Sequence, residues 1–142
     1  LHHLDLRKAY GEIARTLRPD GHAIFIEPLG HNPIINAYRR LTPSLRTPDE
    51  HPMLMSDLRL ADEYFERVEV HYFSLTTFLA IPLRKRRVFK PVLHGLERLD
   101  KALFAVLPFL RRHAWQIVLI LSRPKVPAAS PQADPSRAYS RA

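Results

Sequence analysis

The chain has 142 residues, an apolar fraction of 46% and no cysteine. This length fits one globular domain, and the lack of cysteine excludes disulfides, thiolate metal sites and thiol nucleophiles. Lysine and arginine number 22 against 14 acidic residues, which gives a net charge of +8. The charge indicates anionic partners without choosing among nucleic acid, acidic lipid surfaces and phosphorylated metabolites.

The amino-terminal end carries no secretory signal pattern. The first residue is Leu1 rather than methionine, and no charged leader with an apolar core follows it. We therefore expect the sequence to lie inside a longer chain. No apolar run approaches the roughly 20 residues that cross a bilayer. The longest one, ALFAVLPFL, contains Pro108 and can lie on a membrane but not span it. We expect a cytoplasmic protein.

The first predicted elements are a helix and a strand. Asp5 stands at an N-cap position, and the sequence RPDG supplies a stop. Between them, four apolar residues recur at helical spacing: Leu6, Tyr10, Ile13 and Leu17. The continuous apolar run HAIFIE at 22–27 is typical of a strand covered on both faces in a parallel sheet. Helix, short turn and buried strand make half of a doubly wound α/β unit.

Five further elements and a tail follow. Asn32 and Pro33 open a short helix, and a proline-rich loop leads to a helix that starts at Ser56. The sequence RVEVHYF alternates as a strand does. Pro91 opens a long helix whose apolar stripe comprises Val92, Leu96, Leu99, Leu103 and Val106. The last strand is AWQIVLIL, and residues 124–142, rich in Pro, Ala and Ser, predict a disordered tail.

These elements predict an incomplete sheet. Three strands are too few for a self-contained doubly wound sheet, and the parallel-type strands leave an apolar edge exposed. We therefore expect a missing neighbour beside the strand at 22–27.

The stretch LHHLDLRKAYGEIARTLRPDGHAIFIEPLG resembles the centre of a class I S-adenosylmethionine-dependent methyltransferase of the type 11 kind. In that family a strand ends in LHH or similar, a helix follows, and LRPGG leads into the fifth strand; here Asp20 replaces the first glycine of that turn. The resemblance covers residues 1 to about 123 and implies the last strands of a Rossmann-like seven-stranded sheet, with helices on both faces. It also implies that the final strand is antiparallel and inserted between the fifth and sixth strands.

The cofactor-holding half of the family's fold is absent from this sequence. Family members hold S-adenosylmethionine with a glycine-rich turn after the first strand and an acidic residue after the second, since glycine lets the backbone approach the ligand. Only four glycines are present, and no GxGxG pattern occurs. The resemblance therefore implies the carboxyl-terminal, acceptor-side half of a methyltransferase for a small-molecule or lipid-like acceptor, inactive as this fragment alone.

Polar residues gather after the strand at 22–27, where open α/β sheets bind ligands. By the resemblance, Glu27 and His31 orient or deprotonate the acceptor. Four further residues are candidate substrate-binding residues, in part as clamps for an anionic group: Asn32, Arg39, Arg46 and His51. The alternative is structural: Glu27 pairs with a neighbouring arginine, and the loop residues cap turns.

Two adjacent histidines, His2 and His3, raise the question of a metal site. Adjacent residues at a strand end point to opposite sides, and spacing offers no third ligand, so we expect structural or cofactor-wall histidines instead. Methyl transfer from a sulfonium needs no metal, because positioning the acceptor in line carries much of the rate. The sequence holds no Ser/His/Asp or P-loop pattern that would favour a hydrolase or a kinase.

The basic run RKRR at 84–87 allows two interpretations. It is either a solvated turn or the contact of the protein with an anionic membrane, with neighbouring apolar residues entering the interface. Nucleic-acid binding ranks lower, because no aromatic interleaving or recognised module accompanies the charge. A second hypothesis for the whole chain is a non-catalytic α/β interaction module, whose basic surface and exposed sheet edge bind a partner.

Overall fold

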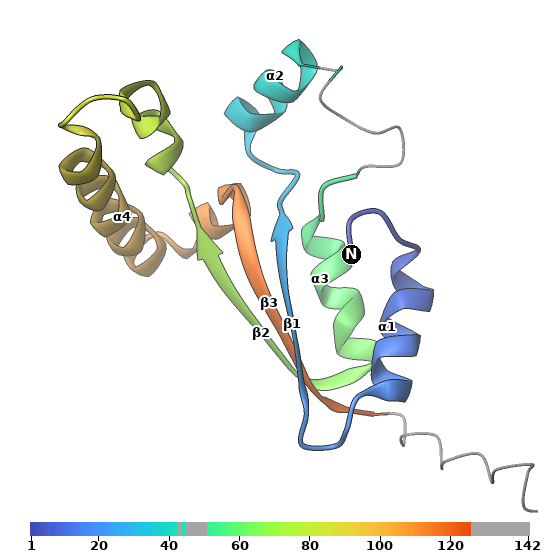
Figure 1. Cartoon of the computed structure of the whole chain (residues 1–142). Coiled ribbons are helices and arrows are strands. Elements are labelled where there is room, and N and C mark those ends of the chain that lie inside the picture. Colours follow the sequence, from blue (N-terminus) through green and yellow to red (C-terminus); the bar gives the residue numbers. More distant parts are fainter. Residues whose placement is uncertain (43, 45–50, 126–142) are drawn as a thin grey trace, which may run out of the picture.

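The computed structural model describes residues 1–42, 44 and 51–125 and shows an α/β fold around one sheet (Figure 1). The strands are β1 (His22–Pro28), β2 (Phe65–Phe73) and β3 (Gln116–Pro124), in the order β1-β3-β2. β3 is antiparallel to both neighbours, so β1 and β2 are parallel to each other. The predicted α/β class is confirmed, as is the place of the final strand between the other two.

The helices follow the chain in the order α1 (Leu6–Thr16), α2 (Pro33–Leu41), α3 (Met55–Leu60) and α4 (Phe89–Val106), with short 3-10 helices η2 (Ala61–Glu63), η3 (Thr77–Leu83) and η4 (Pro108–His113). Two predicted caps are confirmed. The Asp5 carboxylate accepts hydrogen bonds from the backbone of Arg7 and Lys8, and the Asn32 side chain accepts from Ile34 and Ile35. These side chains satisfy N–H groups that the first turn of a helix leaves without partners.

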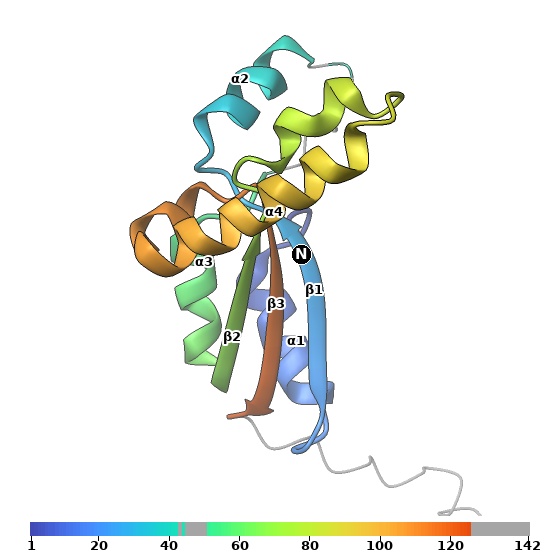
Figure 2. The ribbon, with the colours of Figure 1, turned by 90° about the vertical axis from the view of Figure 1, so that its left-hand side faces the viewer.

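One face of the sheet carries the core. α1 and α3 lie behind the sheet in Figure 2, and residues of both helices belong to the same hydrophobic core cluster as residues of the strands. Ile117, Leu119 and Leu121 of β3 are fully buried there, together with Tyr10 and Phe65. The aromatic pair is edge-on, with ring centroids 6.4 Å apart. β3 is central and apolar because it is covered by neighbours on both edges and by helices on this face.

The opposite face is largely open along β1. Ile24 and Ile26 are 62% and 70% exposed, and their cross-strand neighbours on that face are Ile120 and Val118 of β3. In Figure 2, α4 crosses in front of the carboxyl end of the sheet and leaves the rest of this face uncovered. The prediction that residues 22–27 are covered on both faces is therefore wrong for the described residues. The reason is that, among the described residues, the outer edge of β1 is paired only at its carboxyl end, where Met53 donates to the carbonyl of Pro28, and no helix packs over Ile24 and Ile26.

The long helix also differs from its prediction. α4 begins at Phe89, before Pro91, and buries Asp100 and Phe104, while Leu99 and Val106 of the predicted stripe are exposed. α4 packs mainly against η3 and η4, two elements that the sequence pattern did not indicate. A helix held by short helices on one side presents a different face from a helix that lies flat on a sheet. β3 extends to Pro124, and residues 126–142 of the predicted tail lie outside the described residues.

Identical substitutions on the two faces should have different effects on stability. Ile117→Ala removes a fully buried side chain and should lower the free energy of unfolding by about 2–5 kcal/mol. Ile26→Ala, on the open face, should cost less than about 1 kcal/mol. Urea denaturation followed by the fluorescence of Trp115 measures both. Equal losses would show that the open face is covered in solution, and a dependence of the midpoint on protein concentration would identify self-association as the cause.

Candidate functional site

The carboxyl ends of β1 and β2 lie at the same end of the sheet, and the segments that follow them, α2 and η3, extend beyond that end (Figure 1). Ile117 of β3 pairs with both Glu27 and Tyr72, so the two residues occupy one row across the sheet. With a strand spacing near 4.8 Å, their Cα atoms are about 10 Å apart. This end of the sheet therefore brings the polar segment after β1 close to the aromatic end of β2.

Glu27 is a buried carboxylate that binds the beginning of the chain. Its Oε1 accepts a hydrogen bond of 2.6 Å from the Leu1 amine, and its Oε2 lies 2.6 Å from Nδ1 of His2. Burial raises the pKa of Glu27, but the hydrogen bonds and positive charges of Leu1 and His2 outweigh burial and lower it overall. The described partners of Glu27 are therefore Leu1 and His2, and not the neighbouring arginine that the structural interpretation expected.

The two adjacent histidines form a turn rather than a strand end. The rings of His2 and His3 lie side by side, with centroids 4.2 Å apart, so the prediction that they point to opposite sides is wrong. The turn bends the backbone and brings both rings to one side. No group of three His, Cys, Asp or Glu side chains that could hold a metal ion occurs within the described ranges.

His31 connects two segments far apart in the sequence. Its ring Nε2 accepts a hydrogen bond of 3.2 Å from the backbone N–H of Met55, at the first residue of α3. Its backbone carbonyl accepts from Nδ1 of His113, at 3.0 Å. Burial, helped by the positive charges of Arg112 and His113, lowers the pKa of His31. The ring is therefore held neutral, and its acceptor nitrogen is engaged inside the protein.

Asn32 is buried and makes only internal contacts. Its Oδ1 caps α2, and its Nδ2 donates to the carbonyl of His113, at 2.7 Å. Since both ends of the amide bind backbone groups, the geometry supports a structural role rather than the predicted contact with substrate.

The remaining predicted substrate-binding residues are dispersed. Nη1 of Arg39 donates to the carbonyl of Leu29 and to Oδ1 of Asn36, at 3.3 and 3.1 Å. The backbone N–H of His51 donates to the carbonyl of His2, and the residue is exposed. Arg46 lies outside the described residues. The structure therefore brings Glu27, His2 and the backbone of His51 together and places His31 and Asn32 in a separate network around His113.

Asp100 is a buried carboxylate that the sequence reasoning missed. It accepts hydrogen bonds from the backbone N–H groups of Leu75 and Thr76, and from the Thr76 hydroxyl at 2.6 Å. These contacts fasten the segment between β2 and η3 to α4. A sequence signal was available, because Asp100 lies on the apolar stripe between Leu96 and Leu103, where a charge needs partners.

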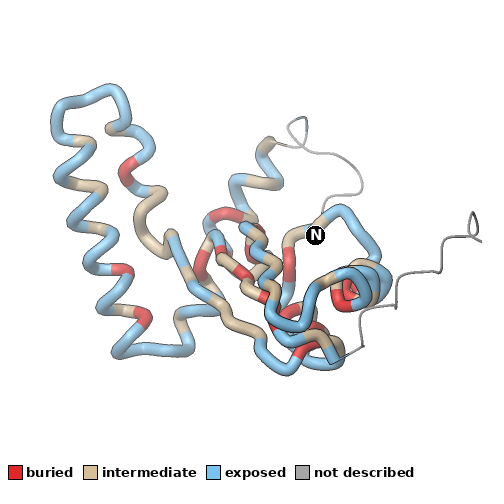
Figure 3. Tube along the Cα trace, turned by 60° about the horizontal axis from the view of Figure 1, so that its bottom comes forward, coloured by how far each residue is buried: buried red, intermediate tan, exposed pale blue. Residues whose placement is uncertain are grey.

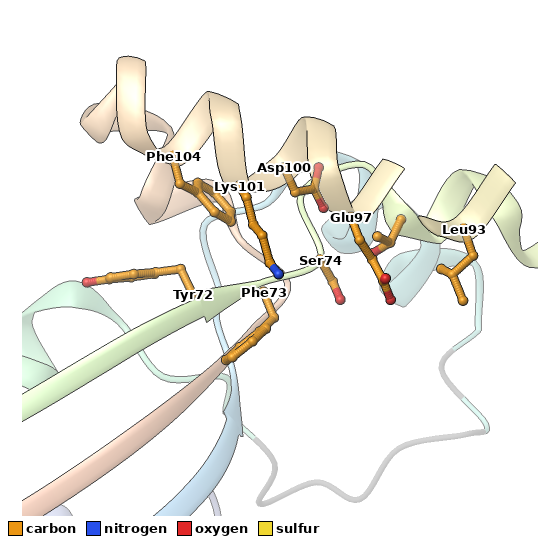
Figure 4. Close-up of a pocket in the computed structure, with 9 residues that line it drawn as sticks. Tyr72, Phe73, Ser74, Leu93, Glu97, Asp100, Lys101 and Phe104 are labelled. Carbon is orange, nitrogen blue, oxygen red and sulfur yellow. The ribbon is translucent and has the colours of Figure 1, made fainter. Parts of the chain in front are cut away.

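A cavity of about 360 Å³ lies between the end of β2 and α4 (Figure 4). Its apolar walls are Tyr72, Phe73, Leu93 and Phe104, and the rings of Tyr72 and Phe104 are 6.3 Å apart. Burial, the largest influence, raises the pKa of Tyr72 against the charge of Arg111.

Two exposed charges, those of Glu97 and Lys101, stand at this cavity. Glu97 pairs with His94 at 3.1 Å, while Lys101 makes no ion pair within the described part of the chain. The cavity therefore offers apolar walls and one cation that is available to a ligand.

Comparison of the chain with protein-family models, curated proteins and solved structures finds no match. No described helix combines the length and the apolar character that a membrane crossing requires.

The hydrogen bond between His31 and Met55 should make stability depend on pH. The folded state lowers the pKa of His31, so its contribution to stability is present above the ordinary value of 6.5 and is lost as the pH falls through the lowered folded value. Urea unfolding between about pH 7.5 and pH 5 should show a fall in stability. His31→Gln should remove that component, because an amide oxygen accepts the bond at either pH. Identical pH profiles for the two proteins would contradict this role of the ring.

Asp100→Ala should loosen the connection between η3 and α4. The change leaves two partly buried N–H groups, those of Leu75 and Thr76, without their acceptor and should cost about 1–3 kcal/mol. Hydrogen exchange at the amides of Leu75 and Thr76 should accelerate. Glu97→Ala, which removes an exposed carboxylate from the same helix, is the control and should leave both amides protected. Unchanged exchange in Asp100→Ala would contradict the anchoring role.

Proposed function

We propose that this chain is the acceptor-side half of a class I S-adenosylmethionine-dependent methyltransferase domain. The observation that carries the proposal is the sheet: an antiparallel final strand inserted between two parallel strands, with helices between them in the sequence. The resemblance of LHHLDLRKAY…LRPDG, followed by β1, to the helix and fifth strand of that family supports the proposal, although His2 and His3 lie in a turn rather than at a strand end. The order of the elements along the chain and the antiparallel direction of the final strand are independent features, and both favour the same family.

The open side of β1 supports the second part of the proposal. An edge strand with exposed Ile24 and Ile26 is costly to leave in water and exposes backbone groups that another strand can pair with. The half that holds S-adenosylmethionine would add its strands beside β1 and its helices over the open face. The cofactor then lies at the carboxyl end of the strands, next to the turn that contains His2 and His3.

The Glu27–His2 pair supplies the acid–base chemistry in this proposal. Glu27 binds Nδ1 of His2, which leaves Nε2 as the nitrogen that can take a proton from an acceptor hydroxyl or acidic carbon. A carboxylate that orients an imidazole and stabilises its protonated form is a common arrangement for a general base. His31 is less suited, because its Nε2 already accepts from Met55. The departing methyl group needs only alignment with the acceptor atom.

The cavity between β2 and α4 favours an acceptor with an apolar body. Its walls are mainly aromatic and aliphatic, and the Lys101 ammonium can bind an acidic group on the same molecule. Small or lipid-like acceptors fit this description. The open face and free edge of β1 also support the competing hypothesis, a non-catalytic module that binds a protein partner there.

The experiment compares this chain with the product of the complete reading frame that contains it. The 142-residue chain should show no saturable binding of S-adenosylmethionine in calorimetric titration, whereas the complete product should bind it and transfer the methyl group. His2→Gln and Glu27→Gln in the complete product should lower kcat by about a hundredfold or more and leave cofactor affinity nearly unchanged.

The matched control is His94→Gln, which removes the histidine of the exposed pair with Glu97. It should leave kcat unchanged. Micromolar binding of S-adenosylmethionine by the chain alone, or a start codon directly before Leu1, would contradict the proposal, and the second result would favour the interaction module.

A further inference from the structure

The turn between η3 and α4 forms a projecting tip of unusual composition. We define the hairpin tip as residues 79–90, which include Arg84, Lys85, Arg86, Arg87 and Lys90. All five of these basic residues are exposed, and Figure 3 shows the turn that carries four of them at the far end of the hairpin. Within the described residues no carboxylate pairs with any of the five.

Exposed aliphatic side chains accompany this charge. Leu79, Ile81 and Val88 are 57%, 47% and 51% exposed, and they lie in the same twelve-residue segment, 79–90, as the basic residues. These aliphatic side chains are therefore exposed to water, next to basic side chains that pair with no described carboxylate. This combination is what an interface between water and lipid accommodates, because the aliphatic groups enter the acyl boundary while the cations stay among anionic headgroups.

Acidic residues are unevenly distributed along the chain. No acidic residue occurs between Glu69 and Glu97, or between Glu27 and Asp49. These two intervals contain the hairpin tip and α2, which both lie beyond the carboxyl end of the sheet in Figures 1 and 2. α2 also exposes apolar residues, with Leu41 at 81%, beside the exposed Arg40. The described part of this end, residues 28–42 and 70–96, is therefore basic and apolar and contains no carboxylate.

We propose that the hairpin tip, assisted by α2, docks on an anionic lipid surface. Asp100 contributes by fastening the base of the hairpin to α4, so that the tip is presented in a fixed position. Nucleic acid fits less well, because single strands stack on aromatic rings, whereas the exposed apolar groups at the tip are aliphatic. This inference stands without the proposed methyltransferase function, since it rests on charge and exposure alone.

The test is co-sedimentation of the chain with vesicles at low salt. One vesicle preparation is pure phosphatidylcholine, and the other contains phosphatidylserine in addition. The chain should sediment with the anionic vesicles only, and salt should release it. Each neutralised cation should weaken the partition coefficient about fivefold, so changing Arg84, Lys85, Arg86 and Arg87 to glutamine should reduce binding to the level of neutral vesicles.

A matched control separates the tip from net charge. Changing Lys8, Arg15, Arg18 and Arg59 to glutamine removes four exposed cations on the α1 and α3 side and lowers the net charge equally. The binding of this control variant to anionic vesicles should stay close to that of the unchanged protein. Ile81→Ser with Val88→Ser should weaken binding without loss of the native circular dichroism spectrum, because both side chains are already exposed.

Three results would overturn the proposal. They are an equal loss of vesicle binding in the two quadruple variants, equal binding of the unchanged chain to neutral and anionic vesicles, and no binding of the chain to either vesicle preparation. The last would leave the tip as a surface for an acidic protein.

Discussion

The pairing of β3 with both β1 and β2 is the constraint on which the rest of the structure depends. Within the described residues β1 and β2 meet only through β3, whose buried Ile117, Leu119 and Leu121 form the middle of the core. The pairs are distant in the sequence, as His22 with Ser122 illustrates. The sheet therefore closes only after nearly the whole described chain is available, and the loop entropy of these contacts is compensated by the burial of β3.

The same pairing determines where polar chemistry gathers. Because β3 is antiparallel to both neighbours, the carboxyl ends of β1 and β2 lie at the same end of the sheet, one on each side of β3, and the chain leaves both strands in the same direction. Glu27, the His31 network and the Asp100 anchor all belong to the segments that start there. His113, just before β3, binds both His31 and Asn32 and so connects the beginning of the last strand to the end of the first. Position in the sheet, rather than distance in the sequence, explains this cluster.

Features that depend on local chemistry could be predicted from the sequence. The N-caps Asp5 and Asn32 satisfy their own helices, and the alternation of β2 and the apolar run of β3 follow strand periodicity. Features that depend on a distant partner could not be predicted. The partner of Glu27 is His2 rather than an arginine, and the acceptor nitrogen of His31 is engaged by Met55, 24 residues away. The position of Asp100 on an apolar stripe indicates that it needs partners, but the sequence does not indicate that these partners are Leu75 and Thr76, which precede it by a whole hairpin.

Two exposed apolar surfaces remain, and their surroundings differ. On β1, Ile24 and Ile26 lie beside a strand edge that no described strand pairs with, and its N–H and C=O groups are left to water or to the backbone of another strand. At the hairpin tip, Leu79, Ile81 and Val88 lie beside basic side chains, which an anionic surface neutralises without supplying backbone partners. A protein strand therefore fits the first surface, and a lipid headgroup layer fits the second. Because the surfaces make different demands, covering β1 leaves the basic tip available, and a domain completed at β1 would still present the tip to a membrane.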